Sequence, residues 1–237
     1  MENKNGCLIC GKDIVYLQSP VNGKCVYCNK EFEINECCID GHFICNSCHS
    51  SDAMNIIEEY CLHTNLINPI EIALTLMKHP SIKMHGPEHH FLVPAVILKC
   101  YYNVTNQENL LNDKIKKARK RAELIPGGFC GSHGNCGAGV GTGIAISIIT
   151  GSTPTSKNEW QLSNLMTSKS LLAIALAGGP RCCKRDVYLG ILEAIAFIKE
   201  KFNVTIPLTE NIRCEFSFLN KECLHNNCKF YFSDKTI

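Results

Sequence analysis

The chain has 237 residues, of which 45% are apolar, and its formal net charge is +2 at pH 7. This length suits one medium domain with a small module, and the near-neutral charge gives no bulk electrostatic reason for binding nucleic acid or a membrane surface. The sequence does not open with a signal-peptide pattern, and no apolar run reaches the ~18 residues of a membrane span. We therefore expect a cytoplasmic protein.

Seventeen cysteines are the outlying feature of the composition. In a reducing cytosol, clustered Cys-x-x-Cys pairs indicate metal sites or reactive thiols rather than disulfides. The odd count also leaves at least one thiol outside any set of disulfides. The composition thus predicts bound metal or thiol chemistry.

Residues 1–50 hold eight of these cysteines and few core-forming residues. Three pairs have the two-residue gap that lets both sulfur atoms turn towards one ion. The pairs are Cys7/Cys10, Cys25/Cys28 and Cys45/Cys48, and a further group is Cys37, Cys38 and His42. The spacing predicts structural metal, most commonly zinc, in a module of residues 1–50 that is too small to build its own core.

The spacing allows two ways of grouping these ligands into metal sites. Sequential pairing joins the first two pairs in a zinc-ribbon spacing, Cys7, Cys10, Cys25 and Cys28. Crossed pairing makes one site of Cys25, Cys28, Cys45 and Cys48, and another of Cys7, Cys10, Cys38 and His42. The run CIDGHFICNSC resembles the middle of a RING or treble-clef finger but is not followed by the final Cys-x-x-Cys of a RING. We therefore favour a metal ion that only stabilises the fold of this module over ubiquitin-ligase activity.

From residue 51 onwards the apolar residues recur at helical spacing. Asn68 followed by Pro69 is a typical helix start, and this helix is expected to stop before Pro80. Further helices are expected at 88–102, 106–123, 138–150, 158–177 and 186–202, with a turn-rich tail from residue 203. The predicted fold class is mainly α: a helical domain of residues 51–237 behind a small zinc-ribbon or treble-clef-like module.

The segment GGFCGSHGNCGAGVGTGIAISIITG, residues 127–151, is rich in glycine. It does not fit a dinucleotide fingerprint, because Thr142 and Ile144 stand where glycine is needed, and it does not fit a P-loop. Gly137, Gly141 and Ala145 lie four apart on one helix face, which predicts a very close neighbour. The next apolar helix, ending in LLAIALAGG, suits that place.

Two groups of cysteines in the body are candidates for chemistry. Cys130, His133 and Cys136 lie at an expected helix N-terminus, where free amides favour thiolates. Cys182 and Cys183 stand among the cations of RCCKR, which we expect to lower their pKa values.

Histidines and tail cysteines add further candidates. The run MHGPEHH places His85, His89 and His90 close together, and this group is expected to bind metal or act in acid–base chemistry, since imidazole serves both uses. His89 and His90 are its proposed catalytic members. The tail holds Cys214, Cys223 and Cys228. With a fourth thiolate from elsewhere these three suit an iron–sulfur cluster, while zinc or merely reduced cysteines are the alternatives.

The sequence has two resemblances. The order Cys130, NCGAGVG and Cys182–Cys183 is similar to redox proteins named for a Cys…Gly-Cys-Ala-x-x-Gly…Cys…Cys pattern, from which it departs at Asn135 and Gly137. The runs GHFICNSCHSSDA, MHGPEHHFLVPAVIL, GGFCGSHGNCGAGVGTG, GGPRCCKRD and NKECLHNNCKF together resemble a cysteine-rich prokaryotic family of unknown function. Its members are sometimes attached to S-adenosylmethionine-dependent methyltransferases or encoded near radical enzymes. This resemblance implies a redox or metal role, and it makes such an enzyme the expected partner.

The sequence therefore predicts a cysteine-rich metalloprotein that handles electrons or sulfur, with zinc in the N-terminal module and an iron–sulfur cluster or reactive thiols in the body. The proposed catalytic residues are Cys130, His133, Cys136, His89 and His90. The proposed cofactor-binding residues are Cys182, Cys183, Cys214, Cys223 and Cys228. The alternative is a non-catalytic, zinc-stapled adaptor for a methyltransferase or radical enzyme. The basic run Lys114–Arg121 is interpreted as a solvated helix face, so nucleic acid is not an expected partner.

Overall fold

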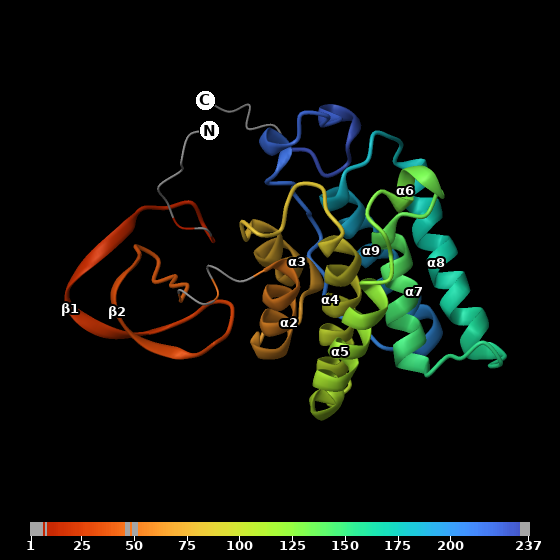
Figure 1. Cartoon of the computed structure of the whole chain (residues 1–237), viewed down its shortest axis with the longest axis horizontal. Helices are drawn as coiled ribbons and strands as arrows, with labels where there is room; N and C mark the ends of the chain where they lie inside the picture. Colours follow the sequence, from red (N-terminus) through yellow and green to blue (C-terminus); the bar gives the residue numbers. More distant parts are fainter. Residues whose placement is uncertain (1–6, 8, 46–47, 49–51, 233–237) are drawn as a thin grey trace.

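The computed structural model describes residues 7, 9–45, 48 and 52–232. The chain forms a two-stranded N-terminal head beside a helical body (Figure 1). The predicted fold class is confirmed: the protein is mainly α with a small N-terminal sheet. None of the helices in the described ranges combines the length and the apolar character needed to cross a membrane.

The head is an antiparallel ribbon of β1 (Ile14–Lys24) and β2 (Glu31–Cys38). Its register runs from Ile14 opposite Cys38 to Lys24 opposite Glu31, with an irregularity between Tyr16 and Val21. Cysteines flank the ribbon at both ends. Because a strand rises about 3.3 Å per residue, β2 separates these ends by roughly 20 Å along the ribbon. The head can therefore carry two separate groups of ligands.

The body consists of α2 (Ala53–His63), α3 (Pro69–Lys78), α4 (Glu88–Val104), α5 (Leu111–Ala122), α6 (Phe129–Ser132), α7 (Gly137–Thr150), α8 (Asn158–Leu176) and α9 (Cys183–Phe202). The helix ends expected from the sequence agree with those of the structure to within a few residues. The exception is the helix expected at 106–123, whose first part is a short 3₁₀ turn. Asn68 caps α3 by accepting hydrogen bonds from the amides of Ile70 and Glu71, and Pro69 takes the first helical position, as predicted.

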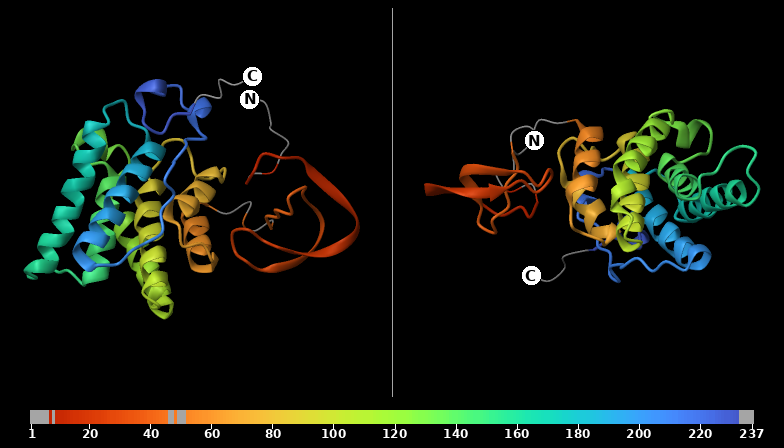
Figure 2. Two further views of the ribbon diagram at one scale, coloured as in Figure 1. Left: turned by 180° about the vertical axis from the view of Figure 1, so that it is seen from behind. Right: turned by 90° about the horizontal axis from the view of Figure 1, so that it is seen from below.

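Helix α4 is the centre of the body. It packs against α2, α3, α5, α7 and α9, and nearly all of its side chains are buried, from Phe91 through Cys100 without interruption. Both views in Figure 2 place α4 among the other helices. A helix that is apolar all round needs such surroundings, because no face of it is suited to water.

The glycines of α7 are packing residues. A Cβ at Gly141 would lie 2.8 Å from Cδ of Pro94 and 2.9 Å from the carbonyl oxygen of His90, both on α4. On the other side, Gly139 and Gly143 face Leu171 and the Ser163 carbonyl of α8. The expected close approach is confirmed, but its partner on the Gly137 and Gly141 face is α4. The prediction of α8 for that face is wrong, since α8 packs on the opposite face, at Gly139 and Gly143.

The head packs on α2 and α3 through Tyr27, which is fully buried. Its ring meets the rings of Tyr60 and His79 edge-on, at centroid distances of 5.7 and 4.9 Å. The side-chain amide of Asn29 donates to the carbonyl of His63 at 2.7 Å. The proposed domain boundary at residue 50 lies outside the described residues.

The tail, residues 203–232, returns along the body to the end where α9 begins (Figure 2). Its only helical elements in the described chain are two 3₁₀ turns, Ser217–Leu219 and His225–Asn227. The Cys214 amide donates to the Phe230 carbonyl at 2.7 Å and closes the tail into a loop. This fold brings the tail cysteines close to the start of α9.

Candidate metal centres and thiol cavity

The first candidate metal centre is at the open end of the ribbon. One ligand atom from each of its four residues lies within 4.8 Å of the others. The residues are Cys7, Cys10, Cys38 and His42. The sulfur atoms of Cys10 and Cys38 are 3.3 Å apart, and Nδ1 of His42 is buried without a hydrogen-bond partner in the described structure. The donor set and the orphaned nitrogen both fit a bound cation.

The protonation of this group suits an ion as well. Burial alone would raise the pKa of Cys38, but hydrogen bonds from the Asp40 amide, Cys10 and His42 outweigh it and lower the pKa to about 7. For Cys10, a hydrogen bond from the Lys12 amide likewise lowers the pKa. Burial and hydrogen bonds with Cys38 and Cys7 outweigh it, so that the pKa of Cys10 is raised to about 11. One thiolate with adjacent thiols is a typical precursor of a metal site, since binding releases the remaining protons.

The second centre is at the closed end of the ribbon, against the body. Its residues are Cys25, Cys28, Cys45 and Cys48, all buried, and their sulfur atoms lie within 4.8 Å of one another. The Cys45 amide donates to Sγ of Cys25 at 3.4 Å. Four buried cysteine sulfur atoms within reach of one ion are the ligand set of a structural zinc site, which binds them as thiolates. The structure thus groups the head ligands in the crossed arrangement, and Cys37 belongs to neither group.

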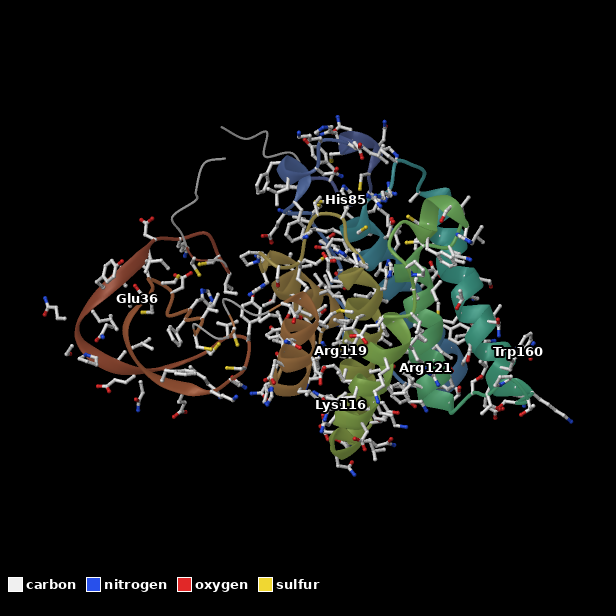
Figure 3. The ribbon with its side chains drawn as sticks, in the orientation of Figure 1. Glu36, His85, Lys116, Arg119, Arg121 and Trp160 are labelled. Atoms are coloured by element: carbon white, nitrogen blue, oxygen red, sulfur yellow. The ribbon has the colours of Figure 1, made fainter. Side chains whose placement is uncertain are left out.

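A third site is a cavity of about 190 Å³ in the body. It opens among the first residues of α4, α7 and α9, with the loop before α6 completing the wall. The ionisable and metal-ligating residues that line it are His85, His89, His90, Cys130, Cys136, Arg181, Cys183 and Asp186. Figure 3 labels His85, at the end of the body near the tail. Three helix N-termini at one cavity favour negative charge there, on thiolate ligands or on an anionic substrate, because their free amides and dipoles carry partial positive charge.

His89 is the most informative residue of this cavity. It is 1% exposed; its Nδ1 lies 3.0 Å from the Gly86 carbonyl, which identifies Nδ1 as the protonated nitrogen. Its Nε2 is buried and has no hydrogen-bond partner in the described structure. Burial first, and then the nearby Lys184, lower the pKa of His89 to about 3. A neutral imidazole fixed by a carbonyl, with its other nitrogen free, is the state in which histidine binds metal.

The neighbouring imidazoles are arranged similarly. Nδ1 of His90 lies 3.2 Å from the Ile125 carbonyl, and Gly137 makes room for the ring, since a Cβ there would overlap it. Nδ1 of His85 is buried and has no partner in the described structure. Two orphaned imidazole nitrogens at one cavity call for a ligand, because buried polar atoms are rarely left unpaired.

The thiols of the cavity differ from the expectation in their acidity. Cys136 donates to Oδ2 of Asp186 at 3.6 Å, and burial together with that carboxylate raises its pKa to about 12. Burial also raises the pKa of Cys183, and it raises that of Cys182 to about 11. Backbone amides and the charges of Arg181 and Arg185 do lower the pKa values of these thiols, but burial outweighs them. The expected net lowering is therefore wrong for all three residues.

Two of the three cations of RCCKR make their contacts away from the thiols, whereas Arg181 lines the cavity. Nζ of Lys184 donates to the carbonyls of Met77 and Ile82 at 2.7 and 3.3 Å. The Arg185 guanidinium pairs with Asp186 at 3.2 Å and donates to the Gly178 carbonyl. A sequence shows which charges are near in the chain, whereas pKa values follow where the side chains point.

The remaining predicted residues fall into two groups. His133 lies outside the cavity: it is exposed, stacks on Phe129 at a centroid distance of 4.2 Å and contacts Ser132. Cys182 faces away from Cys183 into a second pocket, which it lines together with Cys214, Cys223 and Cys228. The vicinal cysteines therefore serve two neighbouring pockets. Asp186 was not predicted as a site residue, although it stands within GGPRCCKRD. His85 belongs to the predicted histidine group and lines the cavity.

The basic run lies on α5, with Lys116, Arg119 and Arg121 labelled in Figure 3. Arg119 pairs with Glu58 at 2.8 Å and with Glu123 at 3.0 Å, and Arg121 donates to Ser147. Its arginines thus make contacts within the body, as expected for the polar face of an amphipathic helix.

The fold and these sites define a cysteine-rich helical protein with two groups of residues that can hold metal ions. The model of a protein family of unknown function, DUF5714, matches residues 57–231, and the chain belongs to this family. The matched region contains the cavity and the tail pocket, whereas both head centres precede it. No curated protein and no solved structure matches the chain.

Proposed function

We propose that the protein is a redox or sulfur-handling metalloprotein whose chemistry takes place in the His/Cys cavity, while two zinc ions staple its head. One observation supports this most: three thiols and three imidazoles from separate parts of the chain line the same cavity, and Nε2 of His89 is buried there without a partner. Packing alone does not explain such a set, because buried polar atoms are costly unless they are paired.

The composition of the cavity favours metal-centred chemistry. Cys130, Cys136 and Cys183 supply soft sulfur donors and His89 a neutral nitrogen, a set that suits zinc, copper or iron, including an iron–sulfur cluster with an open position. These ligand atoms do not lie within 4.8 Å of one another as those of the head do, so an occupant larger than one ion, or rotation of the side chains, is needed to connect them. The volume of about 190 Å³ leaves room for a small substrate beside the metal.

The test is metal analysis of protein purified without oxygen. We expect zinc from the head, and in addition a metal in the cavity that His89→Gln and Cys183→Ala each lose. Cys37→Ser is the matched control, because Cys37 is half-buried and lies outside every site. Brown protein containing iron and sulfide would identify the cavity metal as a cluster. Unchanged metal content in both cavity variants would contradict the proposal.

The second candidate function is a non-catalytic adaptor for a methyltransferase or radical enzyme. The observation in its favour is an apolar strip on the outer face of α8, where Leu172 and Leu176 are 60% and 79% exposed one turn apart. An adaptor requires this strip and needs no metal in the cavity. Protein that contains zinc only in the head, and that loses binding to such an enzyme in Leu172→Ser/Leu176→Ser, would favour it.

A further inference from the structure

The second pocket of the body brings four cysteines together from two distant segments. Cys182 is the residue directly before the first turn of α9, and Cys214, Cys223 and Cys228 come from the tail. All four are half-buried, and aromatic side chains form much of the remaining wall, including those of Tyr188, Phe216 and Phe230. The thiols are therefore partly shielded from water, and Cys214 and Cys228 pack against the edge of the core.

The tail positions its sulfur atoms with backbone amides. The Phe216 amide donates to Sγ of Cys214, and the His225 amide donates to Sγ of Cys223, both at 3.4 Å. In each case the amide is two residues after the cysteine, as it is for Asp40 and Cys38 in the first head centre at 3.3 Å. Amide donors of this kind stabilise a charged sulfur more than a neutral one, so they prepare it for a metal.

The size of the pocket decides which metal group fits. Its volume is about 20 Å³, close to the space that holds a single water molecule. A single ion fits this space as it stands, whereas an iron–sulfur cluster, with several iron and sulfide atoms, requires the wall to move outwards. Four thiolates around one ion are the ligand set of structural zinc. Among the described residues, only the head groups bring their ligand atoms within 4.8 Å, so the tail thiols must turn inward to bind.

The tail also has a structural need for such an ion. Two 3₁₀ turns of three residues each are its only regular elements in the described chain. Few of its side chains are buried, Phe216 and Phe230 among them. A segment with so small a core is usually held by a metal or by disulfides.

We infer that Cys182, Cys214, Cys223 and Cys228 bind one zinc ion, which fastens the tail to the start of α9. This site is separate from the cavity and does not depend on the proposed function. It has one consequence for the cavity, because Cys183 is the next residue after a ligand. The ion fixes the backbone that presents Cys183, so the tail acts as a clamp on one wall of the cavity.

The experiment compares zinc content per chain in the full-length protein and in Cys223→Ser and Cys228→Ser, with Cys37→Ser as control. We expect each tail variant to lose one zinc ion while its far-UV spectrum keeps its helical shape. Cys228→His, which retains a zinc ligand, is expected to keep the ion that Cys228→Ser loses. His89→Gln is expected to keep it too, which separates this inference from the cavity proposal. Tail variants with the zinc content of the wild type would overturn the inference, and so would iron with sulfide lost from these variants.

A second measurement uses the wild-type protein alone, should the serine variants not fold. Lys221 is exposed in the tail between Cys214 and Cys223, so trypsin can report on how firmly the tail is held. We expect cleavage after Lys221 to be slow in zinc-loaded protein and fast after a chelator has removed the metal. Equal cleavage rates in both states would contradict a zinc ion in this pocket.

Discussion

Gly141→Ala tests whether the glycines of α7 are there for packing. The added methyl group would lie 2.8 Å from Cδ of Pro94 and 2.9 Å from the carbonyl oxygen of His90. Neither neighbour can turn aside, because one is part of a proline ring and the other belongs to the backbone of buried α4. The strain must therefore be relieved by moving α7 away from α4.

Overpacking of this kind costs about 1–3 kcal/mol, and the rigid neighbours place it in the upper part of that range. Alanine offsets up to about 1 kcal/mol of this cost, because it is the better helix former. We expect a net loss of roughly 1–2 kcal/mol in the free energy of unfolding. For a chain of this length that corresponds to a fall of about 2–8 °C in Tm.

The assay is thermal unfolding of the metal-loaded protein followed by circular dichroism. Gly131→Ala is the control, since a Cβ there meets nothing within 4 Å, and its effect should stay within about 0.5 kcal/mol. Gly139→Ala should cost less than Gly141→Ala, because it meets the movable end of Leu171. If Gly141→Ala is as stable as the wild type, the packing explanation is refuted, and these glycines would instead indicate a ligand-binding role.

Three further predictions follow from particular contacts. Cys28→Ser should lower the Tm of the whole chain more than Cys10→Ser does, because the second head centre carries the Tyr27 contact with the body; equal shifts would contradict this. His89 stays neutral when folded, with its pKa lowered to about 3, so its contribution to stability is complete above pH 6.5 and declines as the pH falls. From pH 8 to 5 the loss is about 2 kcal/mol, measurable by urea unfolding. The pH dependence should be weaker by this amount in His89→Gln, where the lowered pKa of His90 still contributes; a pH dependence in His89→Gln equal to that of the wild type would rule this source out. Lys184→Met should cost about 1–3 kcal/mol, because two buried carbonyls lose their donor, whereas exposed Lys199→Met on the same helix should be near neutral.

The helices could be predicted from the sequence because their signals are local. Apolar periodicity and the cap at Asn68 depend on residues within a few turns, so the ranges agree with the structure. The grouping of the head ligands is not local. All three Cys-x-x-Cys pairs have the same gap, and the ribbon register that sets Ile14 opposite Cys38 decides which of them meet.

The cavity was only partly predictable for the same reason. Its cysteines and His89 stand in recognisable motifs, but Asp186 joins them through the start of α9, and His133 turns away to stack on Phe129. The acidity of the thiols depends on burial and on where Lys184 and Arg185 point, which composition does not show. Local patterns thus indicated the chemistry, while tertiary packing selected the residues that take part.

The convergence of thiols and imidazoles on a metal in the body cavity is tested most directly by anomalous X-ray scattering from crystals grown without oxygen. The account predicts a metal peak in the cavity within bonding distance, about 2.0–2.3 Å, of Nε2 of His89 and of sulfur from at least two of Cys130, Cys136 and Cys183. Anomalous peaks at the head and tail cysteines, with a cavity that contains only water, would contradict it.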